Sequence, residues 1–409
     1  MTDSSNRSPA LYSTEFVSLI FILFFGFCNM SVFYSFYGYL ERLGIASEWR
    51  GVIVGLEPMS AFFLRPAVSV FIHAGNALQF LRISMILLAG CLCAYMPTVS
   101  LPGLILLRIC HGAAFVTLVS AGIALLVHFI PKERSAHGFG IMSLSSLVPY
   151  AVAPMLTEIA IRHFHNEAVI YAMVSILAVP GIVLISAVGT RIGKRIALID
   201  PGSRQRPTMA QLGRNIRQTP VALILTMNFL VFFVYATVFY FMKTFMAEQG
   251  MASQVGVFFA VSMVVMIVLR TGLGRWMDDA DKSRTIAAMA YFMTVYFAVL
   301  PRVNSFPKLM IAAFGYGVAM GYMLPLLNAL MFENSSKQFE GINSNLMLFM
   351  MDAGFFLCPM VMGGVLASGE ACAFLFTICS IISLIVVVLT VWLMRWQSTH
   401  CCPGANGAN

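Results

Sequence analysis

Apolar residues run through this chain in long continuous stretches, and each stretch is closed by a short polar segment. Many stretches hold 18 or more apolar residues, and a helix needs ~20 residues to cross the hydrocarbon core of a bilayer. The stretches lack the apolar–polar alternation of barrel strands, and a helix pairs its backbone polar groups internally. The pattern predicts an all-α integral membrane protein with twelve transmembrane helices. We expect them at 15–40, 50–72, 78–97, 102–129, 138–162, 168–188, 220–245, 254–277, 285–302, 307–331, 343–367 and 371–395.

A repeat offset of 205 residues divides the chain into two halves. A Leu-Arg pair closes an apolar run in each half, 14 residues after a glycine. The pairs that share the offset are Gly51 with Gly256, Arg65 with Arg270, Gly112 with Gly317 and Pro154 with Pro359. The repeat predicts two pseudo-symmetric six-helix bundles, at 15–188 and 220–395. We expect 1–14 and 396–409 to be tails and the polar segment 189–219 to be a linker.

Composition supports the membrane interpretation and sets the orientation. The 409 residues are 59% hydrophobic and 10% charged, whereas soluble domains carry about 25% charged residues; the mean hydropathy is +0.86. The loops on the side of the two tails carry 16 Lys and Arg, and the opposite loops carry six. Lys and Arg collect on cytoplasmic loops, so we expect both termini in the cytoplasm, in a bacterial inner membrane. The same rule explains the net charge of +8 without nucleic acid.

Two local motifs resemble those of a known family. Arg270-Thr-Gly-Leu-Gly-Arg-Trp-Met-Asp278, followed by Lys282 and Arg284, is similar to the loop signature of the major facilitator superfamily. Leu107-Arg108-Ile-Cys-His-Gly112 resembles its fourth-span motif. The resemblance implies that the two bundles alternately expose a site near the bilayer midplane.

The resemblance also implies a conformational latch at the loop signature and at its first-half copy. In the first half, Ser69 and His73 stand where the signature has glycine and aspartate. A histidine there would make the latch sensitive to cytoplasmic pH. The expected latch residues are Arg65, His73, Arg270, Gly274 and Asp278.

Ionisable residues inside expected spans are further candidates, because such groups are costly in lipid. Glu57 and Asp352 are candidates for proton coupling, since a carboxyl group in apolar surroundings can bind and release a proton near neutral pH. Alternatively, Glu57 reaches water at the outer interface and Asp352 pairs with a helix end or an arginine. Arg108 either holds an anionic solute or makes structural bonds to backbone carbonyls.

Amphipathic aromatic residues and amides on spans one, four, seven and ten describe a pocket for a moderately apolar organic molecule. Packing between helices, or a place in the interfacial belt, is the alternative for each ring. The expected cavity residues are Asn29, Phe33, Tyr37, Arg108, His111, Asn228, Tyr235, Tyr316 and Asn328.

Together these features predict a secondary transporter that works by alternating access and is coupled to protons. The aromatic pocket favours efflux of an amphipathic compound, and Arg108 as an anchor favours import of a small anionic metabolite. Copper import through Met242 and Met246, a membrane sensor and a membrane enzyme are weaker alternatives. The chain has no Walker loop and no metal-site cysteine spacing. We therefore expect no enzyme activity, no cofactor and no metal, and a monomer whose partners are a small solute, H⁺ and the lipid bilayer.

Overall fold

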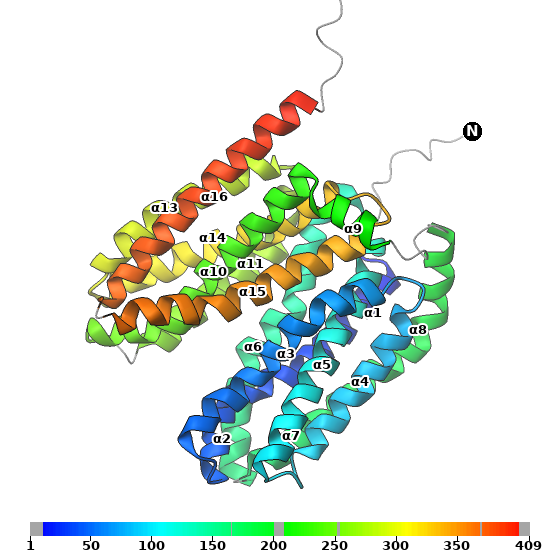
Figure 1. The fold of residues 1–409 in the computed structure, drawn as a ribbon, viewed down its shortest axis with the longest axis vertical. Coiled ribbons are helices and arrows are strands. Elements are labelled where there is room, and N and C mark those ends of the chain that lie inside the picture. The colour runs from blue at the N-terminus through cyan, green and yellow to red at the C-terminus, as the bar shows by residue number, and fades with distance from the viewer. Residues whose placement is uncertain (1–10, 165, 200–207, 252–253, 369, 401–409) are drawn as a thin grey trace, which may run out of the picture. The chain divides into compact units, whose positions relative to one another are not determined.

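The computed structural model describes residues 11–164, 166–199, 208–251, 254–368 and 370–400, and every regular element in these ranges is helical (Figure 1). The sequence-based prediction of an all-α protein is therefore confirmed for the described residues. The side chains of some residues inside the helices, among them Tyr37 and Ser69, lie outside the description.

Helices cover every expected span, but 15–40, 168–188 and 254–277 are each divided between two helices, and α8 and α9 extend helical structure into the expected linker 189–219. The first half contains α1 (Thr14–Ser31), α2 (Phe36–Arg42), α3 (Ser47–Phe71), α4 (Ala77–Ala94), α5 (Leu101–Leu126), α6 (Ser135–Phe164), α7 (Glu167–Val174) and α8 (Ala178–Ile199). The second half contains α9 (Met209–Ile216), α10 (Thr219–Glu248), α11 (Val255–Gly272), α12 (Gly274–Asp279), α13 (Lys282–Val299), α14 (Phe306–Glu333), α15 (Glu340–Ala367) and α16 (Cys372–His400). Short 3₁₀ turns, η1 (Val32–Ser35) and η4 (Ser175–Leu177), join α1 to α2 and α7 to α8.

Ten helical stretches among the described residues are long and apolar enough to cross a membrane. The expected spans 50–72 and 138–162 correspond to α3 and α6, which are helical but are not among the ten. The protein is thus an integral, multi-pass membrane protein. The structure supports ten of the twelve predicted spans by this criterion.

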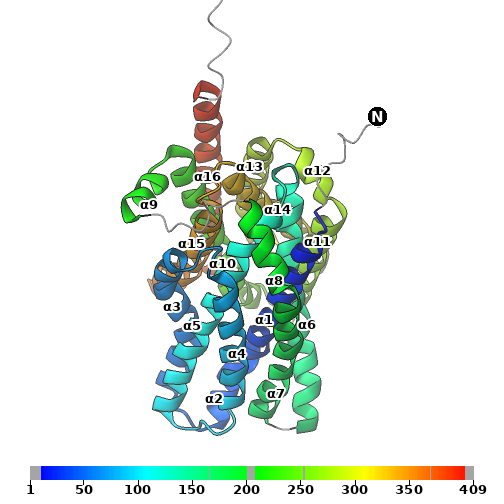
Figure 2. The ribbon, with the colours of Figure 1, turned by 90° about the vertical axis from the view of Figure 1, so that its right-hand side faces the viewer.

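The chain forms two compact units. Unit 1 comprises residues 1–134, 141–207 and 336–349, and unit 2 comprises 135–140, 208–335 and 350–409. Within unit 1, α5 packs against α3 and α4, and α1 packs against α8 (Figure 2). Within unit 2, α14 packs against α11, and α16 packs against α13 and α10.

The sequence repeat has a structural counterpart at one close helix approach in each unit. A Cβ atom placed on Gly112 of α5 would lie 2.7 Å from the Glu57 carbonyl oxygen of α3. A Cβ atom on Gly317 of α14 would lie 2.8 Å from the Ser262 carbonyl oxygen of α11. Both glycines and both contacted residues are related by the offset of 205. Backbone contact at a small residue is a common way for membrane helices to pack closely.

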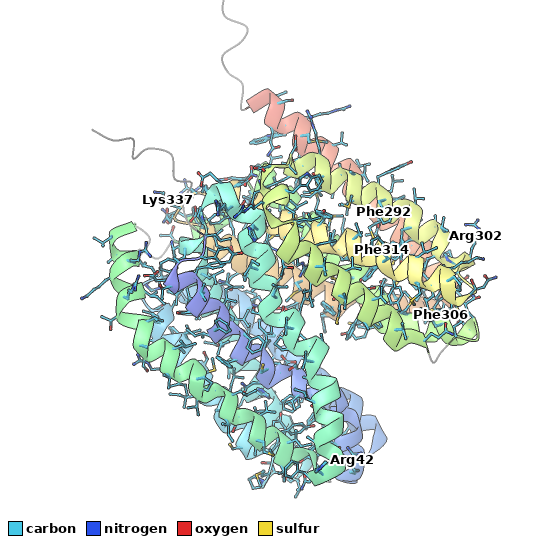
Figure 3. The ribbon with its side chains drawn as sticks, turned by 180° about the vertical axis from the view of Figure 1, so that it is seen from behind. Arg42, Phe292, Arg302, Phe306, Phe314 and Lys337 are labelled. Atoms are coloured by element: carbon cyan, nitrogen blue, oxygen red, sulfur yellow. The ribbon has the colours of Figure 1, made fainter. Side chains whose placement is uncertain are left out.

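Both units expose many large apolar side chains, as expected for helices that face lipid. In unit 2, Phe292 of α13 and Phe314 of α14 are exposed and project from the same side of the unit (Figure 3). In unit 1, Arg42 lies at the end of α2 (Figure 3), and it pairs with the buried carboxylate of Glu167 at the start of α7. Large apolar side chains thus cover the part of unit 2 that the bilayer would surround.

Candidate functional site

Arg108 is a charged side chain enclosed within unit 1. It lies two turns into α5, and only 3% of its surface is exposed. Its Nη2 atom donates a 3.3 Å hydrogen bond to the carbonyl oxygen of Val54 on α3. Its Cζ atom lies 4.8 Å from the ring centre of Phe33 and 4.6 Å from that of Phe36, both within cation–π range.

Arg108 has no ion-pair partner among the residues that the structure describes. Its Nε and Nη1 atoms are buried and make no hydrogen bond. These two nitrogens carry most of the N–H donors of a guanidinium group. The alternative was that Arg108 is a structural residue bonded to backbone carbonyls. Only one of its three nitrogens, Nη2, makes such a bond.

An aromatic cluster surrounds this guanidinium. We define it as Phe33, Phe36, Tyr39, Tyr95, His111 and Tyr171, which come from η1, α2, the end of α4, α5 and α7. Ring centres lie 5.0 Å apart for Phe33 and His111 and 4.6 Å apart for Phe33 and Tyr171. The Tyr39 hydroxyl donates a 3.3 Å hydrogen bond to the carbonyl oxygen of Tyr95. The cluster therefore joins four helices of unit 1 around one positive charge.

His111, a member of this cluster, also lacks a hydrogen-bond partner. It is completely buried, and neither ring nitrogen makes a hydrogen bond. The hydroxyl group of Tyr171, also completely buried, is in the same condition. Buried polar groups are almost always hydrogen-bonded, so a set of unpartnered donors and acceptors in one cluster marks a place that can receive a polar ligand.

Glu57 lies beside this site on α3 and is half-buried. Its backbone contacts Gly112, one residue after His111 in the chain. The equivalent position in the second half is Ser262, whose hydroxyl donates a 2.9 Å hydrogen bond to the carbonyl oxygen of Ala313. Ala313 is in turn the equivalent of Arg108. Two positions that are charged in unit 1 are therefore uncharged in unit 2.

Unit 2 has an aromatic cluster of its own, built by α10, α13, α14 and α15. The ring centre of Tyr316 lies 6.2 Å from those of Tyr235 and Tyr296, and that of Tyr235 lies 5.8 Å from Phe355. Asn228, two turns before Tyr235 on α10, is completely buried. Of the predicted cavity residues, Tyr235 and Tyr316 are thus brought together.

Two predicted cavity amides bond within their own helices. The Asn29 side chain donates a 2.8 Å hydrogen bond to the Phe25 carbonyl, and the Asn328 side chain donates a 2.9 Å bond to the Leu324 carbonyl. Each side-chain amide therefore uses one of its N–H donors within its own helix. The side chain of Tyr37 lies outside the described residues.

Asp352, the second predicted coupling acid, is half-buried on α15. Two residues later, Gly354 meets α10 closely: a Cβ atom there would lie 2.9 Å from the backbone carbon of Phe232. This approach fixes Asp352 on the part of α15 that packs against α10.

The loop signature in unit 2 contacts the beginning of α6. Asp278 accepts a 2.9 Å hydrogen bond through its Oδ1 atom from the backbone N–H of His137, in the first turn of α6. A Cβ atom on Gly274 would overlap the His137 ring. A negative charge at a helix N-terminus is favourable because it meets free N–H groups and the positive end of the helix dipole.

A second acidic residue also holds this end of α6. The Glu333 carboxylate, at the end of α14, accepts a 2.7 Å hydrogen bond from the Ser135 hydroxyl. The same carboxylate lies 2.9 Å from the Lys282 amine at the start of α13. Two elements of unit 2, α12 and α14, therefore contact the first residues of α6, and α13 contacts the Glu333 carboxylate through Lys282.

The other expected latch residues occupy different surroundings. Arg270 is buried and donates to the carbonyl oxygens of Met320 and Gly321 at 3.2 and 3.4 Å. Arg65 is buried in unit 1, with its Nη1 atom 3.4 Å from the Ser120 hydroxyl.

His73 follows the end of α3. Its backbone N–H donates a 2.9 Å hydrogen bond to Asn76 Oδ1, and its ring nitrogen lies 3.4 Å from the Phe71 carbonyl oxygen. These local bonds differ from the cross-helix contact that Asp278 makes. The first-half copy of the signature thus departs from the second in structure as well as in sequence.

Tyr95, Tyr171 and His137 were not predicted as site residues. Both tyrosines fall at the ends of expected spans, where tyrosine is typical of the interfacial belt. His137 precedes the expected span 138–162, because α6 begins three residues earlier, at Ser135. The place of Tyr171 depends on the short α7, which ends after eight residues at η4; the ring centre of Tyr171 lies 4.6 Å from that of Phe33.

The profile of the family described as Major Facilitator Superfamily matches residues 19–359. Among solved structures, the chain is similar to that of FucP, a Major Facilitator Superfamily transporter, in the outward conformation (TM-score 0.73, 12% identity, 94% of this chain and 99% of that chain). It is also similar to the human organic anion transporter MFSD10 (TM-score 0.69, 14% identity, 92% and 98% covered). A further similar structure is of the E. coli fucose:proton symporter FucP (TM-score 0.70, 12% identity, 94% and 99% covered). At this identity the likeness shows the fold alone. None of the curated proteins compared with the chain matches it in sequence.

Proposed function

The chain belongs to the major facilitator superfamily, and from this premise we propose that it is a proton-coupled secondary transporter of a small organic anion. Members of this family are transporters and not enzymes, so the solute would cross the membrane chemically unchanged. The observation that carries the proposal is Arg108, buried in unit 1 without a counter-ion among the described residues. A buried charge is unfavourable unless it is paired, and an anionic solute would supply the missing partner.

The rings around Arg108 suggest the rest of the solute. Phe33 and Phe36 offer their faces to the guanidinium, and Tyr171 offers a hydroxyl group without a partner. A carboxylate would pair with Arg108 by charge-assisted hydrogen bonds, and an apolar or aromatic body would pack among the rings. We therefore propose an amphipathic carboxylate. The similar structure of MFSD10, named as an organic anion transporter, agrees with this class.

Twelve spans complete the proposed architecture. The α3 helix has 25 residues and α6 has 30, and at ~1.5 Å per residue each exceeds the ~30 Å hydrocarbon core. We propose that both cross the membrane despite their polar residues. An even number of spans places both termini on the same side of the membrane. Because the loops on that side carry more Lys and Arg, both termini would lie in the cytoplasm of a bacterial cell.

Alternating access would use the contacts at the start of α6. We propose that Asp278, Gly274 and Glu333 act as a latch, because they hold the first turn of α6 through a carboxylate, a close backbone approach and a hydroxyl bond. Arg65, His73 and Arg270 stay proposed members of the latch. Glu57 and Asp352 stay candidates for the proton pathway, as the carboxyl groups half-buried on α3 and α15.

A screen of the purified protein with matched pairs of compounds tests the solute class. Benzoate, phenylacetate and longer aromatic carboxylates would be compared with their primary amides by thermal shift, since a ligand that binds the native state raises its stability. We expect carboxylates to raise Tm and amides not to, and we expect Arg108→Gln to lose the shift. Equal shifts by acids and amides, or an undiminished shift in Arg108→Gln, would contradict an anion site at Arg108.

Flux into proteoliposomes then tests transport and its direction. A carboxylate that shifts Tm should accumulate under a pH gradient and be recovered unchanged. The anionic solute favours import over the efflux that the aromatic residues alone suggested. Reversing the pH gradient would separate these directions, because import by symport needs the acidic side outside and efflux by antiport moves the solute toward the acidic side.

A further inference from the structure

His111 is placed to take part in the same site as Arg108. The two residues are three positions apart on α5, and such pairs lie on one face of a helix. Both contact the ring of Phe33: the guanidinium carbon lies 4.8 Å from its centre, and the imidazole centre lies 5.0 Å from it. His111 is completely buried, and neither of its ring nitrogens has a hydrogen-bond partner. A neutral imidazole can bind one proton, and it then has an N–H donor on each nitrogen.

We propose that His111 binds the transported proton, and that it does so together with the anion at Arg108. The inference rests on the proposed function, because it assigns the coupled proton to a residue of the same site. Without an anion, a protonated His111 would add a second positive charge beside Arg108 in a buried site, and like charges disfavour each other there. With a carboxylate in place, the added proton restores charge balance and completes a second charge-assisted hydrogen bond.

The linkage between the two ligands follows from this charge balance. If the anion favours proton binding, the proton must favour anion binding by the same factor. The proton comes from the solvent on the side from which the anion enters, binds one ring nitrogen, and leaves with the anion on the other side. Anion and proton would therefore cross in the same direction. This is symport, and it gives import when protons flow inward.

Other ionisable groups near this site compete with His111 for a proton. The ionisable groups of other elements that interact with Arg108 or with the tyrosines of the cluster include the phenols of Tyr39, Tyr95, Tyr150 and Tyr171, the thiol of Cys91 and the carboxyl group of Glu57; Arg108 lies on α5 itself. Phenols and thiols are protonated throughout the neutral range. Glu57 is therefore the one rival among these groups, and it differs from His111 in being only half-buried.

The dependence of carboxylate affinity on pH provides the test. Binding of the aromatic carboxylates from the screen would be titrated by calorimetry between pH 6 and 8, where the carboxylates themselves stay ionised. Uptake of one proton per anion weakens binding about tenfold for each unit of pH above the range in which the site is protonated. We expect this slope in the wild type and a flat profile in His111→Gln and His111→Asn. Titrations in buffers of different ionisation enthalpy count the protons directly.

Two further variants make the result decisive. His163→Gln removes an exposed histidine of α6 in the same unit, and it should keep the slope. Glu57→Gln tests the rival carboxyl group: the slope should persist in this variant if His111, and not Glu57, takes up the proton. Carboxylate binding with no proton uptake in the wild type, or a slope lost in Glu57→Gln and kept in both His111 variants, would overturn the assignment and leave the proposed function standing. Absence of carboxylate binding altogether would overturn both.

Discussion

The carboxylate of Asp278 lies 2.9 Å from the backbone nitrogen of His137 and accepts its hydrogen bond. The bond joins the end of α12 to the first turn of α6 within unit 2. We predict that Asp278→Asn lowers stability only slightly, by ~1 kcal/mol or less, because an amide oxygen can still accept this bond while the charge at the helix end is lost. Transport should fall severalfold if the contact is part of the latch.

The neighbouring Asp281 provides a matched control for that substitution. It also accepts a 2.9 Å bond at a helix start, from the Arg284 backbone N–H of α13, but it is exposed and belongs to the N-cap of its own helix. Asp281→Asn should therefore show a similar loss of stability and normal flux. Thermal unfolding and proteoliposome flux would be measured on both variants. Wild-type flux in Asp278→Asn would remove the latch role.

The close approach at Gly112 gives a prediction about packing. Adding a methyl group there would place it 2.7 Å from the Glu57 carbonyl oxygen, which belongs to the backbone and cannot rotate away. We expect Gly112→Ala to destabilise the protein by about 1–3 kcal/mol, and Gly317→Ala to do the same in unit 2. Gly55→Ala on α3, where nothing lies within 4 Å, should be neutral or slightly stabilising. Equal Tm values for the Gly55 and Gly112 variants would contradict this account of the helix contact.

Arg108 should reduce the stability of the protein when no solute is bound. Replacing it with methionine removes a buried charge that lacks a counter-ion among the described residues and leaves an apolar side chain among the rings. We expect Arg108→Met to raise the stability of the ligand-free protein by on the order of 1–4 kcal/mol while abolishing carboxylate binding. Arg284→Met, at a position 81% exposed, should change stability by less than about 0.5 kcal/mol. A lower Tm in Arg108→Met would show that the guanidinium is a structural element.

Glu15 connects α1 to α8, and its removal should be costly. Its buried carboxylate lies 2.6 Å from Arg191 Nε and 2.7 Å from Arg195 Nη1. Glu15→Gln keeps the shape of the side chain but loses both charge-assisted bonds, so we predict a lower Tm. Glu133→Gln, on an exposed residue, should leave Tm unchanged. The measurement is thermal unfolding at low and high salt. The difference in Tm between the wild type and Glu15→Gln should persist in high salt, because a buried carboxylate is screened less than an exposed one.

Residue types that are rare in lipid made part of the site predictable. Arg108 and His111 stand out in an apolar run, and the structure places them against one ring, that of Phe33. Tyr95 and Tyr171 do not stand out, because tyrosine is common at span ends. Their contribution depends on how α4 and α7 end, and backbone geometry of that kind is not encoded in hydropathy.

The repeat predicted the close contacts between helices more reliably than the residues of the candidate site. Gly112 and Gly317 make equivalent backbone contacts because a close approach requires a small residue in both halves. The charged residues do not follow the repeat: Glu57 has a serine as its counterpart, Ser262. Backbone packing thus shows the symmetry of the two halves, and the chemistry of the candidate site belongs to one of them.

The contact between Glu15 and its two arginines has a consequence for how the protein is made. The partners lie 176 and 180 residues further along the chain. A ribosome adds about 5–20 residues per second, so the first helix waits on the order of ten to forty seconds before its counter-charges are synthesised. During that interval the Glu15 carboxylate must stay in water at the membrane surface or pair temporarily with another group. Completion of the first bundle is therefore timed by translation, and α8 is the segment whose arrival fixes α1 in place.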